Sequence, residues 1–481
     1  MDGERFDVIV IGAGSAGITA ARLARGLGRR VALVEKSRIG GECTWSGCVP
    51  SKALIRAARA AREAGRSGEF GPAWKIPARI DASGALRYVR AVVERVYEGE
   101  KPAVFEAEGI RVIQGAASFT GPHEIAVDAA RFTAKKFIIA TGSRPLVPPV
   151  PGLADTPFLT NETVFALKKL PRSMIVLGGG PIGVELAQAL GRLGVKVTVV
   201  EMAARLLPRE EPELADLVGS FLRAEGVGIM TSVAATGAHK AGNGVMVEVR
   251  ATGAAKAVAL RADTLLVAVG RVPVTDGLGL EHAGVKAGPR GIQVDARMQT
   301  SVSHIYACGD AAGPYYFSHM AGAQAVVAAR NALIPVFRTK MDYSHVPWIT
   351  FCDPELARSG LTEDEARAVH GPSIRVYRHR FEDTDRGKTD GVSGMAKFIL
   401  DKSGRMLGIH ILGPHAGEIL HQALLAKSAG MKFSRMAGMV HAYPSYSDVI
   451  SRPSKQAYVD ELRRHPAVRL IGALASLVKG K

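Results

Sequence analysis

The sequence is poor in cysteine, in aromatic residues and in long apolar or basic runs. Four cysteines in 481 residues are too few for the disulfide framework of a secreted domain. Aromatic residues make up 6% of the chain, and no run of five Lys or Arg occurs, so we do not expect a nucleic-acid partner. No stretch reaches the ~18 consecutive apolar residues of a membrane span. The sequence therefore predicts a protein without a membrane partner.

The composition is that of an ordinary globular protein, with 47% hydrophobic and 22% charged residues, and the length suggests roughly three domains. The net charge of +17 favours anionic partners such as phosphate-bearing cofactors. Acidic residues precede the first apolar run and no small-residue cleavage site follows it, so the N-terminus reads as a strand and not as a signal peptide. We expect a cytoplasmic location.

One structural unit occurs twice in the chain. Each copy contains a short apolar strand, a glycine-rich turn, a helical stretch, a second strand and a glutamate, which is Glu35 in the first copy and Glu201 in the second. Each glutamate follows the first glycine of its turn by 23 residues. The glycines are Gly12, Gly14 and Gly17 in the first copy and Gly178, Gly180 and Gly183 in the second.

This spacing is typical of dinucleotide binding. The first glycine permits a tight strand-to-helix turn, the second lets the backbone approach a pyrophosphate, and the third lets the helix pack on the strand. The phosphate then lies at the helix N-terminus, and the acid binds a ribose diol. Two copies predict two dinucleotides. Glu201 would repel a 2′-phosphate, which favours NADH, although Arg205 and Arg209 could soften that preference toward NADPH.

A pair of cysteines, Cys43 and Cys48, follows the first unit. Four residues separate them, which is not the C-x2-C spacing of a zinc site, and no second Cys/His pair lies nearby. We therefore expect no metal site. A dithiol beside a dinucleotide motif in a reducing compartment is expected to be redox-active. The other two cysteines, Cys308 and Cys352, are expected to be structural.

Residues 40–55, GGECTWSGCVPSKALI, resemble the active-site motif of class I pyridine nucleotide–disulfide oxidoreductases, a family that includes dihydrolipoamide dehydrogenase, glutathione reductase and mercuric ion reductase. Further motifs match in family order over nearly the whole chain. They are ATGSRP at 140–145, GGGPIGVE at 178–185, VGRVP at 269–273, IYACGD at 305–310 and VPWITFCDPE at 346–355.

The resemblance implies an α/β fold with two Rossmann-like dinucleotide-binding domains, for FAD and for NAD, and an α+β C-terminal dimerisation domain. The FAD domain would be discontinuous, comprising 1–150 and 273–345. The NAD(P)-binding domain would span 151–272 and the interface domain 346–481. The enzyme would be a homodimer, in which one subunit completes the active site of the other.

The resemblance also implies residue roles. Cys43 would be the exposed thiol that meets the substrate, and Cys48 would form a thiolate against the flavin. Lys52, one helical turn after Cys48, would lie beside the flavin and pair with Glu185. The first glycine turn and Glu35 would hold FAD, and the second turn and Glu201 would hold NADH. The remaining cofactor-binding positions are Thr141, Gly142, Gly309, Asp310, which would hold the ribityl chain of FAD, and Gly270.

The sequence departs from the thiol-handling members near its C-terminus. Those members carry a His immediately before a proline and a Glu five residues after that His. Tyr443 and Asp448 occupy these positions here, and we predict that both contribute to the active site. A phenol is a poorer base than an imidazole by roughly 3.5 pKa units, or ~5 kcal/mol. His441 would lie about 6.6 Å away along an extended segment, which is too far to replace the missing base without rearrangement, so we do not assign it as the base.

Mercuric ion reductases resemble this sequence in carrying Tyr at that position, but no cysteine follows Cys352 to form their C-terminal metal-binding pair. The expected function is therefore a mercuric-reductase-like flavoenzyme that passes electrons from NADH to a metal ion, a quinone or a small disulfide. Two alternatives remain: a dihydrolipoamide dehydrogenase that tolerates Tyr443, and a redox flavoprotein without turnover. The charged segment from Asp383 to Asp390 is expected to be a solvated turn.

Overall fold

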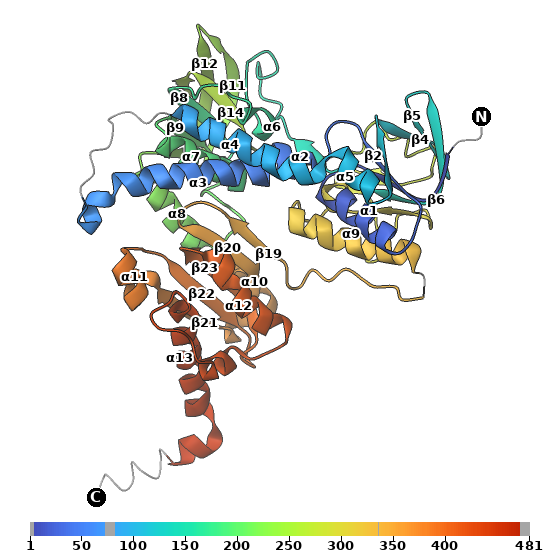
Figure 1. Cartoon of the computed structure of the whole chain (residues 1–481). Coiled ribbons are helices and arrows are strands. Elements are labelled where there is room, and N and C mark those ends of the chain that lie inside the picture. The colour runs from blue at the N-terminus through green and yellow to red at the C-terminus, as the bar shows by residue number, and fades with distance from the viewer. Residues whose placement is uncertain (1–3, 73–81, 335, 472–481) are drawn as a thin grey trace, which may run out of the picture. The chain divides into compact units, whose positions relative to one another are not determined.

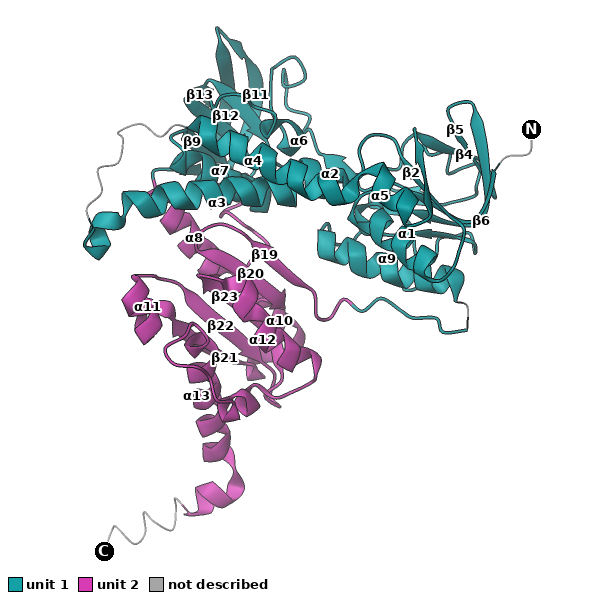
Figure 2. Ribbon diagram, in the orientation of Figure 1, with its two compact units in different colours: residues 1–202, 226–342 teal, residues 203–225, 343–481 magenta. Residues whose placement is uncertain are grey.

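The computed structural model describes residues 4–72, 82–334 and 336–471 (Figure 1). The chain divides into two compact units (Figure 2). The first contains Met1–Met202 and Gly226–Asp342, and the second contains Ala203–Glu225 and Tyr343–Lys481. Residues 73–81 of the predicted FAD domain and 472–481 of the predicted interface domain lie outside the described residues.

The first unit is built around a seven-stranded sheet in the order β3-β2-β1-β6-β5-β4, with β18 paired to β6. The strands β2, β1 and β6 run parallel, as do β3 and β18 beside them, whereas β4 and β5 are antiparallel additions. The strands are β1 (Glu4–Ile11), β2 (Val31–Glu35), β3 (Ile110–Gln114), β4 (Ala117–Gly121), β5 (Glu124–Val127), β6 (Ala130–Ile139) and β18 (Ile305–Ala307).

One face of this sheet is covered by two helices, α1 (Ser15–Gly26) and α9 (Ser318–Leu333), which pack against each other (Figure 1). Small side chains make this close packing feasible, because α1 buries Ala20 and Ala24 and α9 buries Ala325 in the shared core. The late strand β18 thus returns the chain to the sheet that the N-terminus began.

A four-stranded parallel sheet in the order β10-β9-β8-β14 forms the second nucleotide-type layer, together with helix α7 (Pro181–Arg192). Its strands are β8 (Ser173–Leu177), β9 (Lys196–Val200), β10 (Gly228–Met230) and β14 (Thr264–Val267). An antiparallel sheet shares its core and consists of β11 (Val233–Ala241), β12 (Gly244–Ala251) and β13 (Val258–Ala262).

Short elements complete the first unit. Two small antiparallel pairs join β7 (Ser143–Pro145) to β15 (Arg271–Pro273) and β16 (Ala287–Gly288) to β17 (Gly291–Ile292). The helices are α2 (Gly41–Trp45), α3 (Cys48–Gly65), α4 (Ala82–Tyr97), α5 (Pro102–Ala107), α6 (Asn161–Val164) and the single-turn η3 (Gly309–Ala311).

The second unit has a five-stranded antiparallel sheet in the order β19-β20-β23-β22-β21. The strands are β19 (Pro347–Thr350), β20 (Glu355–Gly360), β21 (Arg375–Arg380), β22 (Met395–Leu400) and β23 (Met406–Gly413). The helices are α8 (Pro212–Ala224), α10 (Glu363–His370), α11 (Asp385–Asp390), α12 (Ala416–Ser428) and α13 (Asp448–Arg464).

Segment 203–225 belongs to this second unit, although it lies within the predicted NAD(P)-binding range 151–272. Lys397 on β22 is 2% exposed, and its Nζ lies 2.6 Å from Glu211, 3.1 Å from Glu213 and 2.8 Å from Glu363. A buried ammonium needs such carboxylate partners, because it has lost its hydration. The ion cluster therefore ties the segment to the C-terminal sheet, and the three-domain boundaries stay a prediction.

Candidate redox and dinucleotide site

The first glycine turn joins β1 to α1. Gly12 has a φ of +99°, and a Cβ there would lie 2.4 Å from the Ala140 carbonyl oxygen. A Cβ on Gly17 would lie 1.7 Å from the Gly12 carbonyl oxygen. Neither distance is physically tolerable, so both positions require glycine for the turn itself and for the close approach of helix to strand.

The second turn joins β8 to α7 and repeats this geometry. Gly178 has a φ of +104°, with its virtual Cβ 2.4 Å from the Ala268 carbonyl oxygen. The virtual Cβ of Gly183 lies 1.9 Å from the Gly178 carbonyl oxygen. The first and third glycines of the two turns are therefore under the same backbone constraints, as the internal repeat in the sequence predicts.

The middle glycines behave differently. A Cβ on Gly14 would meet only the Cα of Gly41, at 3.8 Å, and no described atom lies within 4 Å of a Cβ built on Gly180. The protein itself does not need glycine at these two positions. The small size is explained by a ligand backbone that approaches the turn, so the chain fits a dinucleotide pyrophosphate at both places.

The two predicted ribose-binding acids lie at the ends of β2 and β9. Glu35 is buried and accepts hydrogen bonds from the backbone N–H of Ala13, at 2.8 Å, and of Ser37, at 2.8 Å. Glu201 accepts one from the N–H of Gly179, at 2.6 Å. Each carboxylate thus contacts the backbone of its own glycine turn, and the predicted contact of each acid with a ribose diol stays a prediction.

Cys43 lies on α2, and Cys48 is the first residue of α3. Both are free thiols. The hydrogen bond from the Cys43 thiol lowers the pKa of Cys48 to about 6, with further help from Ser318 and from the Lys52 charge. The pKa of Cys43 is raised by the same hydrogen bond and by burial. In the reduced pair the negative charge therefore resides on Cys48.

Lys52 extends from α3 toward α7, where its Nζ lies 2.9 Å from Oε2 of Glu185. The Glu185 side chain is 7% exposed and that of Lys52 is 35% exposed, so a buried carboxylate holds a partly exposed ammonium, whose charge acts on Cys48. The pairing implied by the sequence resemblance is present in the structure.

The remaining predicted cofactor positions lie around η3 and the segment after β6. Asp310 accepts a hydrogen bond from the Ser143 hydroxyl, and burial raises the pKa of Asp310. The Thr141 hydroxyl donates to the Val274 carbonyl oxygen at 2.7 Å. The three glycines among these predicted positions all have a positive φ: Gly142 (+72°), Gly270 (+149°) and Gly309 (+70°).

Sequence reasoning missed several polar residues of this region. Ser318, the first residue of α9, has its Oγ 3.4 Å from the Cys48 sulfur, and nothing in its local sequence indicated this. Arg271 lies inside the VGRVP motif and contacts Glu42 at 2.5 Å. The contact between them joins two motifs that are 229 residues apart in the chain.

Tyr443 and Asp448 both lie in the second unit, but among the described residues the hydrogen-bond partner of the Tyr443 hydroxyl is a different aspartate. The Tyr443 hydroxyl donates to Oδ2 of Asp385 at 3.0 Å, and this bond raises the pKa of the phenol. Asp448 begins α13 and lies 3.9 Å from the Arg452 guanidinium. Within the chain, therefore, Asp385 and not Asp448 is the partner of Tyr443.

The charged segment that contains Asp385 is more than a solvated turn. It forms α11, and the Tyr446 hydroxyl donates to Asp390 at its end. Two tyrosine–aspartate hydrogen bonds thus tie α11 to the segment that carries Tyr443. Cys308 and Cys352 are both buried, and burial raises the pKa of Cys308 to about 12.

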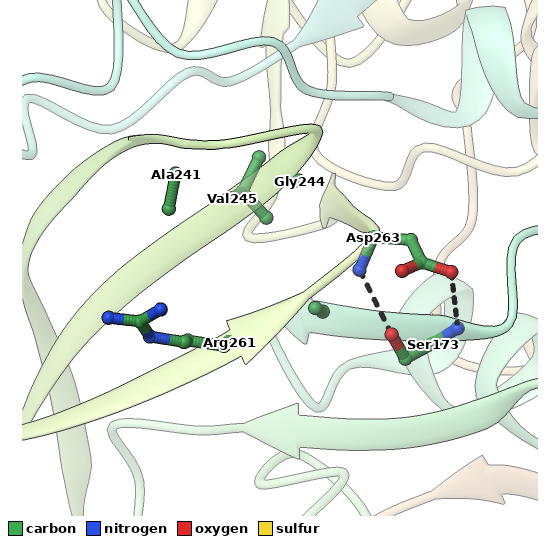
Figure 3. A pocket seen from close by; sticks show the side chains of 7 residues that line it. Ser173, Ala241, Gly244, Val245, Arg261 and Asp263 are labelled. Carbon is green, nitrogen blue, oxygen red and sulfur yellow. Dashed lines mark hydrogen bonds between the residues drawn. The ribbon is translucent and has the colours of Figure 1, made fainter.

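Figure 3 shows a hollow lined by Ser173 at the start of β8 and by Asp263, whose backbone N–H donates to the Ser173 hydroxyl at 2.9 Å. It lies at the amino ends of the parallel strands, whereas dinucleotides bind at the carboxyl ends. We assign it no role. Among the described residues, no cluster of three His, Cys, Asp or Glu side chains is arranged to hold a metal ion. No helix in the described part has the length and apolarity to cross a membrane.

Two family models match the chain. One, described as pyridine nucleotide-disulphide oxidoreductase, matches residues 6–332, and the corresponding dimerisation domain matches 346–453. The chain belongs to the pyridine nucleotide-disulphide oxidoreductase family. Its members are FAD-dependent and use NAD(P)H, which confirms the predicted fold class and cofactors. The preference for NADH over NADPH stays a prediction.

Relatives in this family carry different activities. A dihydrolipoyl dehydrogenase of Thermus scotoductus is 36% identical over 92% of this chain and 96% of its own. A mercuric reductase of Streptomyces lividans is 35% identical over 92% and 94%. A solved structure, the Cu(II) complex of the HOCl-induced flavoprotein disulfide reductase RclA from Escherichia coli, has a TM-score of 0.84 and 30% identity over 94% and 99%.

Proposed function

We propose that the chain is an NAD(P)H-dependent flavoprotein disulfide reductase that passes electrons through a Cys43–Cys48 couple to a thiophilic metal ion. The observation that carries the choice of acceptor is Tyr443 before Pro444, where the thiol-handling members present a histidine. FAD, when bound, supplies the two-electron relay between the nicotinamide and the cysteines. The first glycine turn, Glu35 and Asp310 would hold it, and the second turn with Glu201 would hold the nicotinamide dinucleotide.

The cysteines have separate roles in this proposal. Two electrons and one proton convert the Cys43–Cys48 disulfide to a Cys43 thiol and a Cys48 thiolate, which Ser318 and Lys52 stabilise. Cys43 keeps its proton until an acceptor arrives. A soft metal ion binds thiolate sulfur directly and displaces that proton, whereas thiol–disulfide exchange with lipoamide needs a base beside Cys43.

Tyr443 suits the metal acceptor better than the thiol. Its hydrogen bond to Asp385 raises the pKa of the phenol, so at neutral pH it is a hydrogen-bond donor and not a base. Tyr443 is 72% exposed in the single chain, which allows it to serve the active site of a partner subunit. We infer that the enzyme is a homodimer for this reason, and the matched dimerisation domain agrees with it.

The test is steady-state NADH oxidation by the FAD-loaded protein, with lipoamide, a quinone, Hg(II) in excess thiol and Cu(II) as parallel acceptors. Cu(II) is included because the E. coli relative is described as a Cu(II) complex. We expect metal-dependent turnover that is lost in Cys48→Ser, with lipoamide turnover near background. Tyr443→His should raise lipoamide turnover, and Tyr443→Phe serves as its matched control. Fast lipoamide turnover by the unaltered protein would contradict the proposal.

A second candidate is dihydrolipoamide dehydrogenase, which the Thermus scotoductus relative favours. His441 would then be the replacement base, and its Nδ1 lies 3.1 Å from the Met439 carbonyl oxygen. This candidate expects lipoamide turnover that disappears in His441→Ala, an outcome that the metal-ion proposal does not produce.

A further inference from the structure

The five-residue helix α2 separates the two cysteines and depends on ties to other elements. A helix this short has no stability of its own. The Trp45 indole N–H donates to the Ile39 carbonyl oxygen at 2.9 Å, and the Thr44 hydroxyl donates to Glu100 at 2.8 Å. These two ties reach segments close to the cysteine motif or to α4. The third tie runs through Glu42, which contacts segments far away in the sequence and pairs with a cation.

Glu42 directly precedes Cys43 and connects α2 to two distant segments. Its Oε2 lies 2.5 Å from the Arg271 guanidinium on β15. Its Oε1 accepts a hydrogen bond at 2.8 Å from the side-chain amide of Asn161 on α6. Both carboxylate oxygens are therefore engaged, one by a cation and one by an amide, which is a strong and directional arrangement.

The two partners of Glu42 are themselves fixed. Arg271 is 9% exposed in its side chain and donates to the backbone oxygen of Ser143 at 2.9 Å and to its hydroxyl at 2.8 Å. Asn161 is buried, and its amide also lies 3.4 Å from the Ser46 carbonyl oxygen. Asn161 thus contacts Glu42 near the start of α2 and Ser46 directly after its end, so it holds both ends of the helix that carries Cys43.

Burial and neighbouring charges both change the pKa of Glu42. The charges that act on it come from Arg271, which favours its ionised form, and from Asp310, Cys48 and Glu162, which oppose it. Burial raises the pKa of Glu42 to about 7. Keeping a carboxyl at such a place is unfavourable unless its contacts are needed, and its repulsion of charge on Cys48 acts against the reduced pair.

We propose that Glu42, held by Arg271 and Asn161, is a positioning residue that fixes α2 and thereby sets the stability of the Cys43–Cys48 disulfide. Two effects act in the same direction. A fixed α2 keeps the two sulfurs close, which favours the disulfide, and above pH 7, where Glu42 is ionised, its carboxylate disfavours a thiolate on Cys48. Loss of Glu42 therefore shifts the couple toward the dithiol. The inference rests on the proposed redox use of this pair.

The test is a redox titration of the FAD-loaded protein in dithiothreitol buffers of graded potential, followed by alkylation and mass measurement of the two cysteines. As the Cys43–Cys48 bond breaks, two electrons and one proton pass to the sulfurs to give a Cys43 thiol and a Cys48 thiolate, while dithiothreitol closes to its cyclic disulfide and releases its second proton to solvent. We expect Glu42→Gln and Glu42→Ala to shift the equilibrium toward the dithiol by about tenfold, a factor that corresponds to ~30 mV for a two-electron couple. Glu42→Asp should restore part of the difference.

Thr44→Val is the matched control, because it removes a hydrogen bond from the same helix while leaving the Arg271 and Asn161 contacts in place. An unchanged equilibrium in both Glu42→Gln and Glu42→Ala, with normal FAD content and melting temperature, would overturn the inference. An equal shift in Thr44→Val would also overturn it, because any loosening of α2 would then suffice. Neither readout needs an electron acceptor, so failure of the metal-ion proposal leaves this test intact.

Discussion

The two glycine turns impose the same steric constraints on the backbone but differ in which other residues of the chain approach them. In the first, the Gly40 N–H donates to the Ala13 carbonyl oxygen at 2.8 Å, and Gly41 approaches Gly14. The segment that leads to Cys43 therefore covers the turn. In the second, no described atom outside the neighbouring residues of the turn and its helix lies within 4 Å of a Cβ built on Gly180. The same motif thus makes a covered site, suited to a resident cofactor, and an open one, suited to a cosubstrate that must leave after each turnover.

The two glycine motifs, which both lie in the first compact unit, are also linked by an ion pair. The helix that follows the open turn carries Glu185, only two residues after Gly183, and Glu185 holds Lys52 one turn beyond Cys48. The ion pair therefore joins the helix of the second glycine motif to the helix that carries Cys48. Substitutions in each turn should therefore affect FAD binding and NADH binding separately.

The largest effect is expected from the third glycines. Gly17→Ala and Gly183→Ala each force a methyl group into a carbonyl oxygen, at or above the ~3 kcal/mol upper end of typical overpacking. Gly17→Ala should lose FAD and all turnover, whereas Gly183→Ala should keep FAD and lose response to NADH. Flavin absorbance per protein and NADH titrations distinguish the two. Full FAD retention in Gly17→Ala would contradict the assignment of the first turn to FAD.

A smaller effect is expected at the open position. Gly180→Ala adds a methyl group where no described atom opposes it, so the melting temperature should not change. The methyl group should nevertheless obstruct the pyrophosphate and raise the KM for NADH by about tenfold, since a single lost phosphate contact is worth roughly 1–2 kcal/mol. Gly26→Ala at the end of α1 is the matched control, because its added methyl group also meets no neighbour and should leave the KM unchanged.

The ion pair between Lys52 and Glu185 gives a pH-dependent prediction. With the pKa of Cys48 lowered to about 6, alkylation of the reduced protein at Cys48 should be fast above pH 6 and should slow as pH falls through 6, because the thiolate is protonated. Lys52→Met removes a positive charge that stabilises the thiolate, so the midpoint should rise by about one pH unit. Lys52→Arg, which keeps the charge, should restore the lower midpoint. Identical profiles for all three proteins would show that Lys52 does not act on Cys48.

The features that the sequence predicted well are those set by local sterics. Gly12 and Gly178 must adopt a positive φ, and Gly17 and Gly183 must admit a neighbouring carbonyl, so the spacing of the motif encodes them directly. The Glu42–Arg271 and Tyr443–Asp385 contacts could not be read in this way. Their partners come from elements far apart in the chain, and their meeting depends on how the strands and helices pack.

The contacts of segment 203–225 with the C-terminal sheet could not be read from the sequence for the same reason. Its helix follows the second Rossmann-like unit in the chain, and its amphipathic pattern fits a helix on either sheet. What decides its place is Lys397, whose burial on β22 requires the carboxylates of Glu211 and Glu213. A lysine in an apolar strand, MAKFIL, is a signal that carboxylate partners exist, but it does not say where in the chain they are.

The smallest expected effect concerns the two acids. Glu201 accepts the Gly179 N–H and would face the ribose of the cosubstrate, where its charge repels a 2′-phosphate. Glu201→Gln keeps an oxygen acceptor and removes the charge, so the ratio of kcat/KM for NADH to that for NADPH should fall by roughly fivefold to tenfold, about 1 kcal/mol. Glu35→Gln in the covered turn should leave that ratio unchanged and weaken FAD retention instead. If Glu35→Gln altered the nucleotide preference while Glu201→Gln did not, the assignment of the two turns to their cofactors would have to be exchanged.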